Sequence, residues 1–155
     1  MVKAIQVGLG HWGFSWTKEV IPKVPNIEMV GYVDSNPEAT KRVQTELGID
    51  EALCFNSLED AAAAGGADLA ICTLRTEAHY PVVKRCLELG YNVIVEKPFA
   101  STIAQAKELV ALAKANGRVL MVSQNYRFQP APTSPSARCG PRPTTRWSSA
   151  AWSWA

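Results

Sequence analysis

A glycine-rich hexapeptide near the N-terminus constrains the fold more than any other feature of the sequence. Residues 8–13 follow the G-x-G-x-x-G pattern, a short, mostly apolar run (residues 4–7) precedes them, and residues 14–20 can continue as a helix. In a strand–turn–helix unit the three glycines allow a tight turn, close approach of a pyrophosphate, and close helix–strand packing. The diphosphate would lie on free N–H groups at the helix N-terminus. The pattern predicts a dinucleotide-binding turn made by Gly8, Leu9, Gly10, His11, Trp12 and Gly13, with His11 and Trp12 shaping it.

An acidic residue follows the next apolar run at the distance that such a site requires. Residues 27–33 are expected to form a second strand, and Asp34 stands at its carboxyl end, beside Ser35. A carboxylate there can accept hydrogen bonds from an adenosine ribose. The alternative is that Asp34 caps the next helix, but Ser35 and Asn36 can cap it instead. We therefore favour the ribose role.

The same carboxylate bears on the choice of cofactor. A negative charge at Asp34 would repel a 2′-phosphate, so NAD is the expected cofactor. Lys41 and Arg42 stand one turn into the following helix and keep NADP as the alternative.

Strand-like and helix-like segments alternate as far as residue 122. This alternation predicts an α/β fold, a doubly wound parallel Rossmann sheet of six strands in the order 3-2-1-4-5-6, in which ligands bind beyond the carboxyl ends of the strands. Further strands are expected at residues 53–55, 68–73, 92–95 and 119–122, and helices at residues 37–47, from Ser57 to Gly65, from near His79 to Leu89, and at residues 102–115.

Two of these helices carry more detailed expectations. The helix from near His79 would have Pro81 in its first turn. The helix at residues 102–115 is expected to be amphipathic. Its apolar face would contain Ile103, Ala106, Leu109, Val110 and Ala113.

Composition limits the function classes. The chain has 155 residues and a formal net charge of +2, and its apolar runs are shorter than a membrane span. We therefore expect no nucleic-acid or membrane partner and a cytoplasmic location. The four cysteines follow no metal-ligand or disulfide spacing, so reduced thiols and no metal site are expected.

Five motifs in a fixed order resemble the glucose–fructose oxidoreductase/inositol dehydrogenase/rhizopine catabolism (Gfo/Idh/MocA) family. The resemblance spans residues 3–128, and Glu-Lys-Pro after the fifth strand is its most specific element. Arg75 departs from the family pattern, which usually has an asparagine there. The matching pieces are residues 8–13, Asp34, Thr73 followed by His79, Glu96-Lys97-Pro98, and Gln124-Asn125-Tyr126-Arg127-Phe128.

The resemblance implies an NAD(P)-dependent oxidoreductase that transfers hydride between nicotinamide and a secondary alcohol or ketone of a sugar, inositol or similar polyol. Lys97 would be catalytic, because it would hydrogen-bond the substrate hydroxyl beside a nicotinamide whose positive charge disfavours the ammonium form. Pro98 resembles the family's rigid, often cis, turn. The alternative for Lys97 is a solvated side chain paired with Glu96. The resemblance also implies cofactor contacts by Ser35, Thr73, Leu74, His79, Glu96, Lys97 and Asn125.

One motif is interpreted as chance. Tyr80 and Lys84 have the spacing of the tyrosine–lysine pair of short-chain dehydrogenases, but the glycine spacing of that family is absent.

The composition changes after Phe128. Residues 129–155 contain five prolines, three arginines and three tryptophans but no Leu, Ile, Val or Met, so they cannot form the apolar face of a core element. We expect an NAD(P)-binding domain at residues 1–128 and a non-family, disordered tail at residues 129–155, either a frameshift product or a flexible extension. The family's second, substrate-binding domain would then be missing. A non-catalytic dinucleotide-binding module is therefore the alternative function, and a homo-oligomer is compatible with either.

Overall fold

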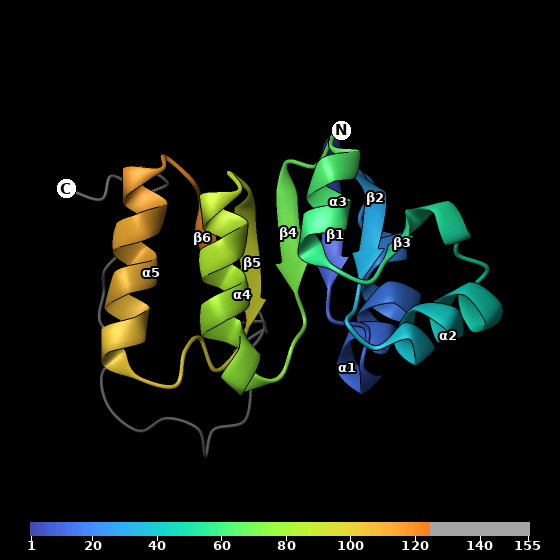
Figure 1. Cartoon of the computed structure of the whole chain (residues 1–155), viewed down its shortest axis with the longest axis horizontal. Coiled ribbons are helices and arrows are strands. Elements are labelled where there is room, and N and C mark those ends of the chain that lie inside the picture. Colours follow the sequence, from blue (N-terminus) through green and yellow to red (C-terminus); the bar gives the residue numbers. More distant parts are fainter. Residues whose placement is uncertain (125–155) are drawn as a thin grey trace, which may run out of the picture. The chain divides into compact units, whose positions relative to one another are not determined.

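The computed structural model describes residues 1–124, which form one six-stranded sheet with helices packed against it (Figure 1). The strand order is β3-β2-β1-β4-β5-β6, and every neighbouring pair is parallel, as the sequence predicts. The order reverses between β1 and β4, where ligands bind in open parallel sheets. The strands are β1 (Val2–Val7), β2 (Ile27–Val33), β3 (Cys54–Phe55), β4 (Leu69–Cys72), β5 (Asn92–Glu96) and β6 (Leu120–Ser123).

Five α-helices connect these strands. Figure 1 shows α3, α4 and α5 together in front of the sheet. Right-handed crossovers assign α1 and α2 to the opposite face, because the chain moves the other way along the sheet before β3. The helices are α1 (His11–Ser15), extended by a π-helical turn (Trp16–Val20) and a 3₁₀ turn (Ile21–Lys23), α2 (Pro37–Leu47), α3 (Leu58–Ala64), α4 (Thr76–Glu88) and α5 (Ile103–Ala115).

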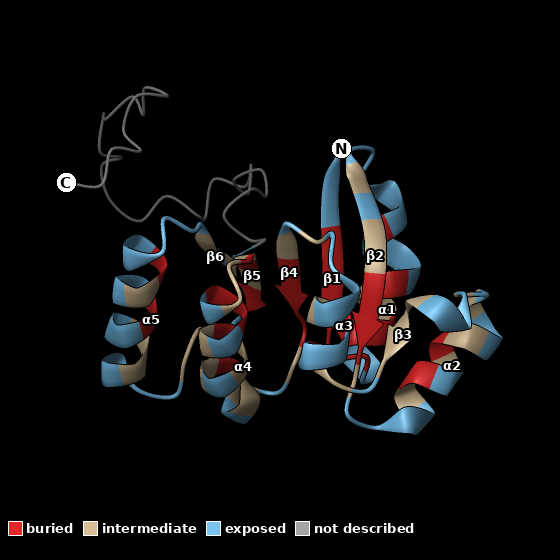
Figure 2. Ribbon diagram, turned by 45° about the horizontal axis from the view of Figure 1, so that its top comes forward, coloured by how far each residue is buried: buried red, intermediate tan, exposed pale blue. Residues whose placement is uncertain are grey.

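Strand β1 divides the core into two layers because successive side chains point to opposite faces. Ala4 packs with Ile21 and Ile71 on the α1 side, whereas Ile5 and Val7 join the larger cluster under α3, α4 and α5. Burial increases toward the carboxyl ends of β1 and β2, as Figure 2 shows. The edge where a ligand would bind is therefore held by the most buried part of the sheet.

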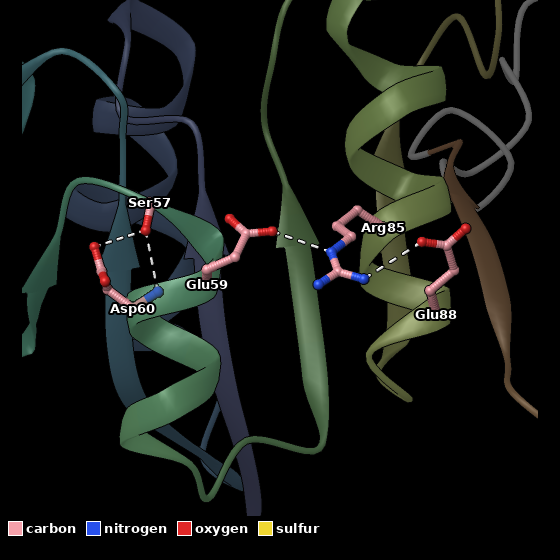
Figure 3. A network of polar contacts seen from close by, with 5 residues as sticks. All are labelled: Ser57, Glu59, Asp60, Arg85 and Glu88. Carbon is pink, nitrogen blue, oxygen red and sulfur yellow. Dashed lines mark hydrogen bonds and ion pairs between the residues drawn. The ribbon is translucent and has the colours of Figure 1, made fainter.

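Side-chain caps fix where several helices begin. Asn36 accepts a hydrogen bond from the backbone N–H of Glu38 and caps α2, and Thr102 caps α5 in the same way. The helix start expected at Ser57 is confirmed, and Ser57 is its cap: Ser57 Oγ accepts from the Asp60 backbone N–H at 3.1 Å and donates to the Asp60 carboxylate at 2.6 Å (Figure 3).

One surface ion pair joins α3 to α4, and a second lies within α4. Arg85 contacts Glu59 at 3.0 Å and Glu88 at 3.5 Å (Figure 3), and its guanidinium lowers the pKa of the Glu59 carboxyl. These side chains are exposed, so solvent screens the pairs and they orient the helices more than they stabilise them.

The start of α4 differs from the prediction. The helix begins at Thr76 rather than near His79, so Pro81 lies inside it and not in its first turn. Arg75 is extended, and the N–H of Ala78 already bonds its carbonyl oxygen. The prediction used proline as a marker of the first helical turn. The helix begins earlier, and its backbone accommodates the missing N–H of Pro81.

The apolar face of α5 is also rotated from the prediction. Leu109 and Ala113 are buried as expected, but the side chains of Ile103 and Val110 are 76% and 43% exposed. Among residues 1–124, Figures 1 and 2 show α5 as the outermost helix, next to α4. No other element of this part of the chain covers its outer side, and Ile103 and Val110 of the apolar stripe are exposed.

Candidate functional site: a dinucleotide-binding edge

The glycine turn adopts a geometry that only glycines at its two ends permit. Gly8 has φ = +95°, and a Cβ there would lie 2.8 Å from Leu74 Cδ2. A Cβ on Gly13 would overlap the carbonyl oxygen of Gly8 and lie 2.9 Å from Thr73 Oγ1. A Cβ on Gly10 would meet nothing within 4 Å, so the space beside this residue is open. The first and third glycines serve packing, and the second borders open space.

A buried polar network beneath the turn was missed by the sequence reasoning. Gln6 is fully buried in β1, and its Nε2 donates to the carbonyl oxygen of Gly13 at 2.8 Å and to Thr73 Oγ1 at 3.0 Å. Thr73 Oγ1 donates to the Gly8 carbonyl oxygen at 2.6 Å, and Thr17 Oγ1 donates to Gln6 Oε1 at 2.7 Å. A glutamine inside an otherwise apolar strand was the signal that could have found it.

The N-terminus of α1 differs from those of the capped helices. Its N-cap, Gly10, has no side chain to accept from the first-turn N–H groups. The N–H of Leu9 donates to Asp34 Oδ2 at 2.7 Å, while the Leu9 side chain is buried in the core. His11 and Trp12 begin α1 and are both exposed. The turn therefore presents backbone donors at the surface.

Asp34 lies at the carboxyl end of β2, half-buried beside this turn. Besides Leu9, it accepts a hydrogen bond from the N–H of Asn36 through Oδ1 at 2.9 Å. Since Asn36 caps α2, Asp34 is not the helix cap. Two backbone donors orient the carboxylate and leave lone pairs for further hydroxyl groups. Ser35 is exposed next to it.

Lys41 and Arg42, the two basic residues that keep NADP as an alternative, differ in their surroundings. The Arg42 guanidinium stacks on the ring of Phe14, 3.8 Å from its centroid, and pairs with Glu46 at 3.0 Å. Lys41 is exposed. Arg42 is thus engaged within α1 and α2.

The carboxyl end of β5 carries the Glu-Lys-Pro motif. Glu96 is buried, and its carboxylate accepts from the N–H of Lys97 at 3.2 Å. The Lys97–Pro98 peptide bond is cis, as the resemblance implies. The Lys97 side chain is exposed, and within residues 1–124 it forms no ion pair with Glu96.

The loop after β4 approaches this motif. Thr73 is buried under the glycine turn and Leu74 is half-buried beside it. His79, in α4, is 1% exposed, and both of its ring nitrogens face backbone carbonyl oxygens, those of Leu74 and Pro98. The structure thus brings the predicted residues of β1, β2, β4 and β5 to one edge of the sheet, whereas Asn125 lies outside the described residues.

Tyr80 and Lys84 are engaged elsewhere. Both contact the carboxylate of Glu108 on α5 at 2.7 Å. Hydrogen bonding to that carboxylate raises the pKa of Tyr80, and the Lys84 ammonium lowers the pKa of Glu108. The pair therefore links two surface helices.

Other classes of site find no support in the part of the chain that the structure describes. Residues 1–124 hold no group of three or more potential metal-ligating side chains. No helix among them is long and apolar enough to cross a membrane. Cys54, Cys72 and Cys86 are free thiols, and hydrogen bonding with Cys86 together with burial raises the pKa of the Cys72 thiol.

The strand order, glycine turn and acidic residue after β2 together define a dinucleotide-binding Rossmann domain. The sequence model of an oxidoreductase family with an NAD-binding Rossmann fold, Gfo/Idh/MocA, matches residues 2–124. The chain belongs to this family, whose Rossmann fold binds NAD.

Comparison with individual proteins agrees with this family membership. The chain is 53% identical over 58 residues to the uncharacterized oxidoreductase YhhX of Escherichia coli, covering 37% of this chain and 16% of that protein. It is 28% identical over 132 residues to the scyllo-inositol 2-dehydrogenase (NAD(+)) of Bacillus subtilis, covering 84% of this chain and 37% of that protein. The WlbA dehydrogenase of Bordetella pertussis, solved with NADH and UDP-GlcNAcA, has a TM-score of 0.73 at 25% identity, covering 81% of this chain and 36% of that one. The chain therefore spans well under half of these relatives.

Proposed function

We propose that this chain is the NAD-binding part of a dehydrogenase that acts on a secondary alcohol or ketone of a sugar, inositol or similar polyol. Family membership supports an oxidoreductase, and the similarity to a scyllo-inositol dehydrogenase supports a polyol substrate. The observation that carries the proposal is Lys97: an exposed amine at the carboxyl end of β5, on the same sheet edge as the glycine turn.

The residues at this edge fit the cofactor. Open space beside Gly10 and the uncapped N–H groups of α1 suit a pyrophosphate, and the remaining lone pairs of Asp34 suit the ribose hydroxyls. The Asp34 charge disfavours a 2′-phosphate, and Arg42 is already engaged by Phe14 and Glu46. These features favour NAD over NADP.

Lys97 would act on the oxygen of the substrate. When bound, NAD supplies a hydride acceptor at C4 of the nicotinamide. The carbinol C–H bond breaks with its electron pair, the O–H proton passes to Lys97 Nζ, and the carbonyl forms. In the reverse direction the Lys97 ammonium donates that proton to the ketone oxygen. Glu96 steadies the residue by accepting its backbone N–H.

A dehydrogenase assay over a polyol panel tests the proposal. We expect Lys97→Ala to lower turnover by about 100-fold or more while NAD binding changes little, because general acid–base groups contribute at least that factor. Lys107→Ala, an exposed lysine on α5, is the matched control and should leave both unchanged. NAD binding without turnover of any polyol would instead favour a non-catalytic dinucleotide-binding module.

A further inference from the structure

Both ring nitrogens of His79 contact backbone carbonyl groups, and these groups belong to two different loops. Nδ1 lies 2.8 Å from the carbonyl oxygen of Pro98, and Nε2 lies 3.0 Å from that of Leu74. A neutral imidazole can donate one of these hydrogen bonds at a time, and the doubly protonated ring donates both. The ring is 1% exposed, so in this arrangement it offers no nitrogen to a ligand.

The two carbonyl groups lie at functionally different places. Leu74 follows Thr73, whose hydroxyl donates to the carbonyl oxygen of Gly8 in the glycine turn. Pro98 directly follows Lys97, after β5. A connected set of hydrogen bonds and short peptide segments therefore runs from the glycine turn through the β4 loop and His79 to the Lys97–Pro98 turn.

The anchor of this connection is a rigid element. His79 belongs to α4, whose residues Val83, Cys86 and Leu87 are fully buried in the main core cluster. Within residues 1–124, by contrast, the Glu96 carboxylate accepts a hydrogen bond from the N–H of Lys97 alone, one residue away, so in this part of the chain it does not tie the turn to β4.

We propose that His79 is a positioning residue that holds the Lys97–Pro98 turn against the end of β4. It thereby sets the place of Lys97 relative to a dinucleotide on the glycine turn. This inference rests on the proposed function, in which Lys97 borders the nicotinamide. Loss of the ring nitrogens should disturb the nicotinamide end of the site and spare the adenosine diphosphate end.

Calorimetric titrations with NAD⁺ and with ADP-ribose, which lacks the nicotinamide ring, separate the two ends. His79→Phe keeps a planar ring of similar size and removes both nitrogens. We expect its affinity for NAD⁺ to fall about tenfold, the effect of one net hydrogen bond, and that for ADP-ribose to stay within about threefold. Val83→Ala, a buried change in the same helix, should leave the ratio of the two affinities unchanged.

Equal losses for both ligands, or no loss for either, would overturn the proposal. If His79→Phe does not fold, His79→Gln, whose single amide cannot span both carbonyls, should give the same selective loss. If the unsubstituted chain binds neither ligand, the proposed function fails. The role of His79 in holding the Lys97–Pro98 turn is then tested by NMR without ligand. The amide resonances of Lys97 and Phe99 should shift in His79→Phe and not in Val83→Ala. Unchanged resonances in His79→Phe would contradict the positioning role.

Discussion

At the scale of single residues, the three glycines of the turn have separable tasks. A Cβ on Gly13 collides with the Gly8 carbonyl oxygen, whereas one on Gly10 meets nothing within 4 Å. Steric demand therefore identifies Gly13 as a packing residue. The open side of Gly10 marks where a ligand can approach the backbone.

We predict opposite outcomes for two alanine substitutions. Gly13→Ala should reduce the free energy of unfolding by about 2 kcal/mol, because overpacking at a closed site costs that much. Gly10→Ala should leave stability nearly unchanged but weaken NAD binding. Thermal denaturation and NAD titration of both variants measure this; a stable Gly13→Ala protein, or unaltered NAD affinity in Gly10→Ala, would contradict the assignment.

The sequence predicted the turn and the close packing at Gly13 because the glycine spacing has a direct steric meaning. It also placed Asp34 at the end of β2 and left the helix cap to its neighbours, of which Asn36 is the cap; the contacts of these residues with a cofactor stay predictions. It could not show that the nitrogens of His79 are occupied by two carbonyls, because these lie on separate loops that meet only in the folded chain.

At the scale of elements, the sheet order and most strand bounds followed from apolar periodicity and turn residues. Two predictions about helices were wrong because they depend on the surroundings: the start of α4 depends on the extended Arg75, and the buried face of α5 depends on α4, its neighbouring helix within residues 1–124. Periodicity predicts that a helix has an apolar face but not how far neighbouring elements cover it.

The network around Gln6 is the main feature of β1 that periodicity cannot predict. We expect Gln6→Leu, which preserves approximate size, to lower the free energy of unfolding by about 1–2 kcal/mol, since Thr73 Oγ1 loses its buried amide donor and Thr17 Oγ1 keeps the carbonyl oxygen of Gly13 as its acceptor. Urea denaturation measures this, and Gln44→Leu on the surface helix α2 is the control. Stability equal to that of the unsubstituted chain would show that the network is dispensable.

At the scale of the molecule, residues 1–124 bring burial and the predicted site residues together at one edge of the sheet. The buried carboxyl ends of β1 and β2 carry the glycine turn and Asp34, and the neighbouring ends of β4 and β5 carry Thr73 and Lys97. A rigid sheet thereby positions the loops that, in the proposed function, would hold a dinucleotide and the reacting oxygen of a substrate.

An NMR titration of the isotope-labelled chain with NAD⁺ and with NADP⁺ tests this account most directly. We predict that the amides of residues 8–13 and 34–36 shift, that NAD⁺ binds at least about tenfold more tightly than NADP⁺ because Asp34 repels the 2′-phosphate, and that Asp34→Ala narrows this difference. Shifts confined to the opposite edge of the sheet, no shifts at all, or tighter binding of NADP⁺ would contradict the central claim.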